Sequence, residues 1–133
     1  MENKLYELEA KRKDLYRQIE ALGDFRPGSI SVIFRKCGKK NCVCAQRNHP
    51  GHGPQYLWTT TRKGKSQGQN LRLGPELDKV QKEVETCKHF NRLCQELTIV
   101  SEQICQMRSV PEISNEHDLE NLKKKLRAKF ARK

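Results

Sequence analysis

The sequence predicts a mainly α protein in which two helices pair as an antiparallel stalk, a small metal-stapled β-hairpin module lies between them, and a basic helix follows. Apolar residues recur every three or four positions on both sides of a central segment. That segment gathers cysteines and histidines and has no Asp or Glu from Phe25 to Pro75. With 35% hydrophobic and 32% charged residues among 133, the chain favours elongated helices over a large core.

Residues 1–24 are predicted to form a coiled-coil-like helix. Gly23 suits the position after its last turn, and Pro27-Gly28 prevents continuation. Arg12 interrupts the apolar seam, so its charged end either reaches solvent or marks a shallow contact. The seam consists of Leu5, Leu8, Arg12, Leu15, Ile19 and Leu22.

Within the module, residues 25–74, a β-hairpin is predicted after Pro54. Gln55–Thr61 is rich in aromatic and β-branched residues, residues 62–65 suit a turn, and residues 66–73 return with Leu71 and Leu73 alternating. Tyr56 and Trp58 are expected to pack the hairpin onto the following helix, and the alternative is stacking on unpaired bases.

A long helix is predicted over residues 75–110. Pro75 suits its first turn, Glu76 and Asp78 complement its dipole, and Pro111 ends it. The helix is expected to pair antiparallel with residues 1–24, and a homo-oligomer through the helices is a further expectation. Its apolar positions are Leu77, Val80, Val84, Cys87, Phe90, Leu93, Leu97, Val100, Ile104 and Met107. Cys87, Cys94 and Cys105 are interpreted as small core residues near one apolar face.

Residues 111–133 are predicted to form a basic helix that covers part of the pair. Ser114 or Asn115 can cap it. Its acidic start and basic end either complement the helix dipole or form a nucleic-acid-binding tail, and both interpretations stay open. The apolar stripe is Leu119, Leu122, Leu126 and Phe130, and the bases are Lys123, Lys124, Lys125, Arg127, Lys129, Arg132 and Lys133.

Cys37, Cys42 and Cys44 form a C-x4-C-x-C cluster, with His49 and His52 beyond it. Structural zinc prefers four Cys or His ligands in a tetrahedron, so the cluster predicts one zinc ion and a zinc-stapled module. Either histidine supplies the fourth ligand. Hydrolytic and deaminase sites need a nearby carboxylate as general acid or base. Because the segment has none, the zinc is expected to be structural and the protein is expected not to be an enzyme.

The motifs Pro27-Gly28-Ser29, Cys37-Gly38-Lys39 with Cys42 and Cys44, and His52-Gly53-Pro54 resemble an uncharacterised bacterial and archaeal family. Its signature is P-G-S, C-G-K-x-x-C-x-C and H-G-P, often in mobile-element, transposase-associated surroundings. The resemblance covers roughly residues 26–95 and leaves the first and last helices outside. It implies a hairpin before a long helix, favours His52 as the fourth ligand and implies no established activity.

The charge of the chain is unevenly placed. Of the formal +11, residues 25–75 contribute +10, the preceding residues −1 and the following residues +2. Such a basic segment around a metal cluster predicts a nucleic-acid partner, DNA rather than RNA. The alternative is a helical protein-interaction or assembly subunit whose zinc-binding module, residues 25–74, binds a protein. The predicted nucleic-acid contacts are Arg35, Lys36, Lys39, Lys40, Asn41, Arg47, Arg62, Lys63, Lys65, Arg72, Lys123, Lys124, Lys125 and Arg127, with Gln55 and Gln69 also available for base edges.

The sequence has no apolar run of membrane-spanning length and no secretory leader at its start. We therefore expect a cytoplasmic protein without a membrane partner, which includes association with the nucleoid. A transposase or another mobile-element enzyme is the expected larger partner, on the strength of the resemblance alone.

Overall fold

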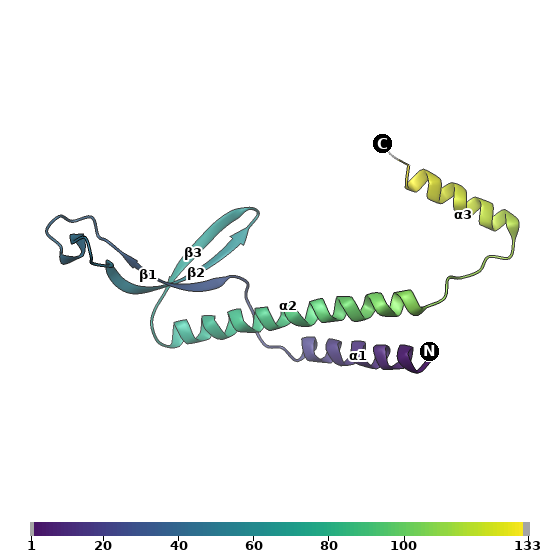
Figure 1. Ribbon diagram of the computed structural model, residues 1–133, viewed down its shortest axis with the longest axis horizontal. Helices are drawn as coiled ribbons and strands as arrows, with labels where there is room; N and C mark the ends of the chain where they lie inside the picture. Colours follow the sequence, from purple (N-terminus) through teal and green to yellow (C-terminus); the bar gives the residue numbers. More distant parts are fainter. Residues whose placement is uncertain (1, 132–133) are drawn as a thin grey trace.

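A computed structural model describes residues 2–131, which fold into three helices and a three-stranded antiparallel sheet (Figure 1). None of the helices in this described part has the length and apolar character that crossing a membrane requires. In chain order the elements are α1 (Glu2–Glu20), β1 (Ser29–Arg35), the short 3-10 helix η1 (Val43–Ala45), β2 (His52–Arg62), β3 (Lys65–Leu71), α2 (Pro75–Met107) and α3 (Glu116–Lys129).

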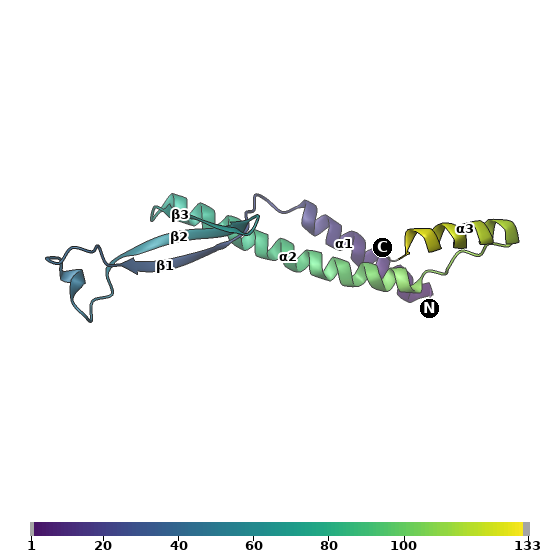
Figure 2. The same ribbon diagram turned by 90° about the horizontal axis from the view of Figure 1, so that it is seen from above.

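Helices α1 and α2 lie side by side and run in opposite directions (Figures 1 and 2), as the stalk prediction requires. Their shared core consists of Leu15 on α1 and Leu93, Val100 and Ile104 on α2, all nearly buried. Because each helix offers one apolar stripe, pairing removes both stripes from water at once. The residues packed around this core are Leu5, Leu8, Ile19, Leu22 and Leu97.

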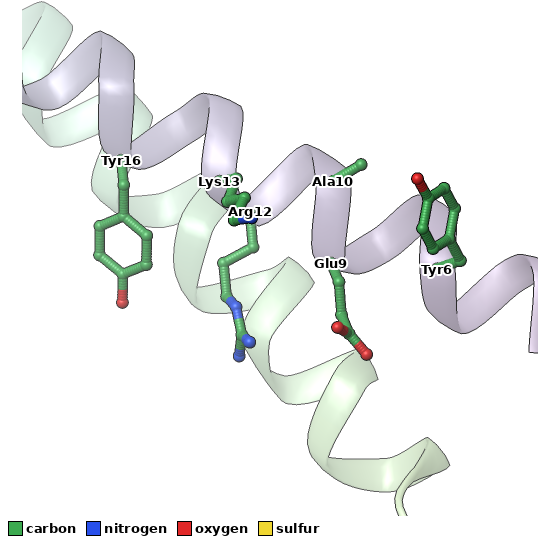
Figure 3. Close-up of a pocket in the computed structure, with 6 residues that line it drawn as sticks. All are labelled: Tyr6, Glu9, Ala10, Arg12, Lys13 and Tyr16. Atoms are coloured by element: carbon green, nitrogen blue, oxygen red, sulfur yellow. The ribbon is translucent and has the colours of Figure 1, made fainter.

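Arg12 lies at the edge of this helix pair and is half-buried. Figure 3 shows it on α1 between Glu9 and Tyr16, with its guanidinium extending along the ribbon of α2. Its aliphatic carbons can therefore cover the pair while the charge stays near solvent. Beside it, Glu9 forms an ion pair with Arg108 at 3.5 Å, linking α1 to the residue that follows α2.

The sheet has the strand order β1-β2-β3, so the predicted hairpin is two strands of a three-stranded sheet. The sequence interpretation missed β1, although Ser29–Arg35 is rich in the β-branched and aromatic residues that strands prefer. In the register, Ile30 pairs with Trp58, which pairs with Gln69 on β3. The third strand forms because β2 pairs with β1 along one edge and with β3 along the other.

The turn between β2 and β3 is the predicted one, since Arg62 and Lys65 pair and leave two residues between them. Lys63 and Gly64 both have positive φ angles, 51° and 76°, as the commonest tight hairpin turn requires. The predicted return strand was two residues too long. Strand β3 ends at Leu71, and Leu73 is 74% exposed where the chain turns into α2.

One face of the sheet packs on the first turns of α2. Leu71, Val80 and Val84 form the buried centre of this contact. Tyr56 and Trp58 pack against it, so the aromatic residues of the hairpin have the structural role that the sequence interpretation favoured. Ile30 and Leu77 complete the cluster.

The segment before β1 packs beside the contact between the sheet and α2. The indole N–H of Trp58 donates to the carbonyl of Pro27 at 2.8 Å. The guanidinium of Arg26 lies 4.7 Å from the centre of the Trp58 ring and 2.8 Å from a carboxylate oxygen of Glu83 on α2. The rings of Phe25 and Phe90 stack with centroids 4.7 Å apart. Sheet, α2 and the segment leaving α1 are thereby joined.

Two helix predictions are wrong. Helix α3 does not cover the α1/α2 pair but stands apart from it (Figure 1), and none of its residues is buried. The extended segment after Arg108 carries it away from the pair. Cys105 is exposed rather than in the core, because it follows the core residue Ile104 and points about 100° around the helix from it. Cys87 is buried and Cys94 half-buried.

Candidate metal centre and its basic surroundings

Four candidate ligands come from three short pieces of chain at the end of the sheet farthest from the helix pair (Figure 1). Cys37 follows β1, Cys42 and Cys44 lie at the start of η1, and His52 is the first residue of β2. Cys44 is 1% exposed, which makes its sulfur the buried centre of this loop. We call residues 36–52 the cysteine loop.

The pairing of β1 with β2 brings His52 to the cysteines. Arg35, which lies two residues before Cys37, pairs with His52. The strand register shifts between Ile33 and Arg35. Gly53 makes that shift of register possible. Its φ is +155°, which residues with a side chain rarely adopt, and a Cβ atom there would lie 2.7 Å from the ring of Phe34. The glycine of the H-G-P motif thus sets the position of the histidine before it.

Within the loop, a tight turn presents the other ligands. The amide of Cys42 donates to the carbonyl of Lys39 at 3.2 Å, and the amide of Ala45 donates to the carbonyl of Cys42 at 3.0 Å. The amide of Cys37 donates to the sulfur of Cys44 at 3.4 Å. Backbone groups therefore hold the cysteines close together without an apolar core.

The geometry of the four ligand atoms suits a metal ion. All lie within 4.8 Å of one another. The sulfurs of Cys37 and Cys44 are 3.5 Å apart, and the sulfur of Cys42 is 3.1 Å from Nε2 of His52. A zinc tetrahedron with Zn–S bonds of about 2.3 Å has S–S edges of about 3.8 Å. The three thiols and the imidazole can hold a metal ion such as zinc.

His49, the competing ligand, has a different contact. Its Nδ1 accepts a hydrogen bond from the amide of Gly51 at 3.0 Å, and it does not belong to the cluster of close ligand atoms. The cluster contains His52 instead. The structure therefore favours the His52 assignment and gives His49 a role in shaping the loop.

The thiols differ in their acidity. The amide of Lys39 and then the side chain of His52 lower the pKa of Cys37 from 9.0 to about 6. The amide of Cys37 lowers the pKa of Cys44, but burial and the neighbouring sulfurs of Cys42 and Cys37 outweigh it and raise that pKa above 9.0. Since metal ions bind thiolates, a metal at this site displaces a proton from Cys44.

The predicted contact residues of the cysteine loop and of the adjoining end of β1 are exposed around this cluster. They are Arg35, Lys36, Lys39, Lys40, Asn41 and Arg47. Lys36 donates to the carbonyl of Gln46 at 3.2 Å. Among the described residues, Arg26 is the only base between Phe25 and Pro75 that forms an ion pair. Within the described part of the chain, no carboxylate therefore pairs with the bases of the loop.

A second group of bases lies at the β2–β3 turn, where Arg62, Lys63 and Lys65 are exposed, and Arg72 is exposed where β3 leads into α2. We call the cysteine loop and this turn together the basic head. The predicted tail residues Lys123, Lys124, Lys125 and Arg127 are exposed on α3, beyond the opposite end of α2 (Figure 1). The structure thus separates the tail from the basic head.

Residues 5–82 match the family model of a domain of unknown function, DUF6788. The chain belongs to this family. The DUF6788 region contains the whole basic head and nearly all of α1, which the resemblance left outside, and it ends at residue 82 in α2 rather than near residue 95. No curated protein and no solved structure matches the chain.

Proposed function

We propose that this protein is a zinc-stabilised nucleic-acid-binding accessory protein whose partner is DNA. The observation that carries the proposal is the basic head, in which exposed Lys and Arg side chains surround the candidate metal centre at one end of β2 and gather at the β2–β3 turn at its other end, without a carboxylate in the same segment. Phosphates are the groups that neutralise such a surface with the greatest gain, because their binding releases condensed counterions.

The zinc ion in this proposal has a structural role. Three cysteines and one histidine fill a tetrahedral shell, so no position remains for a water or a substrate. The segment that carries them also lacks a general acid or base. We therefore propose a non-enzymatic protein in which zinc holds the cysteine loop in one shape.

The loop and the turn then have related roles. In this proposal Lys39 and Lys40 in the cysteine loop, and Arg62 and Lys63 at the other end of β2, contact phosphates, and Asn41 supplies a base-edge contact. Phosphate contacts fix the position of the protein and carry little sequence information. An accessory role beside a transposase rests on the motif resemblance alone.

The test is binding to duplex DNA as a function of salt. Lys39→Glu with Lys40→Glu, and separately Arg62→Glu with Lys63→Glu, should each weaken binding on unrelated sequences. Each lost phosphate contact should reduce the slope of log affinity against log salt by about 0.9. Lys11→Glu with Lys13→Glu, on the exposed side of α1, changes the net charge equally and is the matched control.

A second candidate function has its own observation. Val32 and Phe34 on β1 are 55% and 47% exposed, and Val43 beside the metal centre is 64% exposed. Val32 and Phe34 share one face of β1, and exposed apolar side chains next to one another are typical of protein-binding surfaces. If DNA affinity is indifferent to the four head substitutions and to the control alike, the zinc head as a protein-binding module becomes the better interpretation.

A further inference from the structure

One face of α3 is apolar and is not covered by the rest of the described chain. Leu119, Leu122 and Leu126 follow one another at spacings of three and four, so they share a face. Leu122 is 39% exposed and Leu126 is 40% exposed. We call these three residues the α3 stripe. A helix of fourteen residues is marginal in water without a partner for its apolar face.

A groove of matching character lies on the helix pair, between the start of α1 and the end of α2. Leu8, Ile99 and Met107 form its apolar lining, and Lys4 and Glu102 are among its polar residues. Its volume is about 460 Å³, and Ile99 is 57% exposed. We call it the stalk groove.

The two surfaces agree in length. At 1.5 Å per residue, the α3 stripe from Leu119 to Leu126 extends for about 10 Å. On the same measure Ile99 and Met107 lie about 12 Å apart along α2. The α3 stripe is therefore long enough to cover most of the stalk groove.

The α3 stripe and the stalk groove also have complementary charges beside them when α3 runs antiparallel to α2. Between Leu93 and Met107, α2 has two carboxylates, Glu96 and Glu102, and no Lys or Arg. Lys4 lies at the end of the groove near Met107. In the antiparallel orientation, the acidic first turn of α3, with Glu116 and Asp118, faces Lys4.

The same orientation places the basic second half of α3 beside the carboxylates of α2. Lys123 and Arg127 flank one side of the stripe, and Lys125 and Lys129 flank the other. Opposite charges along the α2 side of the apolar contact and at the Lys4 end favour this direction, because the reverse orientation brings like charges together.

We propose that the α3 stripe of one chain docks on the stalk groove of a second copy, and that the reciprocal contact closes a symmetric, exchanged dimer. Arg108–Asn115 carries α3 away from its own helix pair (Figures 1 and 2), which leaves its own groove open to another chain. Two identical contacts related by a twofold axis cover both α3 stripes and occupy both stalk grooves.

The mass of the purified full-length protein, measured by sedimentation equilibrium, tests this dimer. Wild type should be dimeric at micromolar concentration, and Leu122→Glu should weaken dimerisation at least tenfold. Ala128→Glu is the matched control, since it adds the same charge on the exposed opposite side of α3. A monomeric wild type, or a dimer equally sensitive to both substitutions, overturns the proposal.

A complementation experiment separates exchange from docking within one chain. Ile99→Glu damages the groove and Leu122→Glu damages the stripe, so each variant alone should be monomeric. When mixed, the intact stripe of the first variant meets the intact groove of the second, and a 1:1 heterodimer should form. Absence of that heterodimer overturns the exchanged arrangement, and its appearance supports it.

Discussion

At the scale of single residues, similar side chains in the basic head have different roles. His52 faces the sulfur of Cys42 at 3.1 Å, whereas His49 accepts the amide of Gly51 at 3.0 Å. Arg26 belongs to the basic segment by sequence, yet its guanidinium is held between Trp58 and Glu83. A residue's contacts therefore decide whether it is available to a ligand or supports the fold.

The two histidines give the first prediction. Purified His52→Ala should bind zinc more weakly than wild type, by more than the roughly 10- to 100-fold that losing an outer-shell partner costs. His49→Ala should keep one zinc per chain. Metal analysis after dialysis against a competing chelator measures both. If His52→Ala retains its zinc and His49→Ala loses it, the ligand assignment is reversed.

Glu83 gives a prediction of pH dependence. The Lys79 ammonium, and then the Arg26 guanidinium, hold its pKa below the ordinary value of 4.5. A lowered folded-state pKa contributes stability that is present above pH 4.5 and is lost as pH falls through the lowered pKa. Glu83→Gln should remove this contribution. Denaturant unfolding from neutral to acidic pH should therefore give a smaller acid loss in Glu83→Gln than in wild type.

The control for that measurement is Glu85→Gln, whose side chain is exposed on the same helix. Protonation of the candidate metal ligands in acid should affect wild type and both variants equally, so the comparison isolates the carboxylate. If Glu83→Gln and Glu85→Gln lose stability with falling pH in the same way, the ion pair with Arg26 has no part in holding the sheet to α2.

At the scale of elements, the 33 residues of α2 serve two separate clusters. Its first turns hold the sheet through Val80 and Val84, and its second half holds α1 through Leu93, Val100 and Ile104. No single apolar core is large, as expected for a chain in which 32% of the residues are charged. Stability depends on the continuity of this helix.

Ile104 is the most sensitive position in the helix pair, because only 1% of it is exposed. Ile104→Asp buries an unpaired charge and leaves a cavity, so it should reduce the free energy of unfolding by roughly 3–5 kcal/mol. Gln95→Asp, at an exposed position of α2, should cost less than about 1 kcal/mol. Urea unfolding at equal protein concentration compares them, and equal losses would contradict the observed pairing of α1 with α2.

At the scale of the whole molecule, the metal centre and the helix pair lie at opposite ends of an extended structure (Figure 1). The cluster that joins the sheet to α2 contains none of the candidate ligands. Local unfolding of the cysteine loop can therefore occur without separation of α1 from α2.

Metal removal should show this division. A chelator should increase amide hydrogen exchange across residues 36–52 and the adjoining ends of β1 and β2, because the loop has no apolar core of its own. Exchange in the second half of α2 should stay unchanged. Uniform loss of protection along the chain would mean that zinc holds the whole fold rather than the loop.

Several features of this protein are determined by the sequence alone, because they depend on neighbouring residues. Apolar spacing of three and four predicts α1 and α2, and residues 62–65 between β-rich runs predict the turn that joins β2 to β3. The ligand types predict the metal, since Cys and His at close spacing suit zinc. The absence of carboxylates from Phe25 to Pro75 fixes the sign of the charge on the head.

Tertiary structure decided the rest, because those features depend on segments far apart in the chain. Strand β1 exists through its pairing with β2, and that pairing selects His52 over His49 by placing it opposite Arg35. The exposure of Cys105 and the position of α3 likewise depend on which helix faces are covered, and an apolar stripe alone does not determine its partner. The local sequence pattern determines which helices and strands form. The free energy of packing between distant residues determines which of them contact one another.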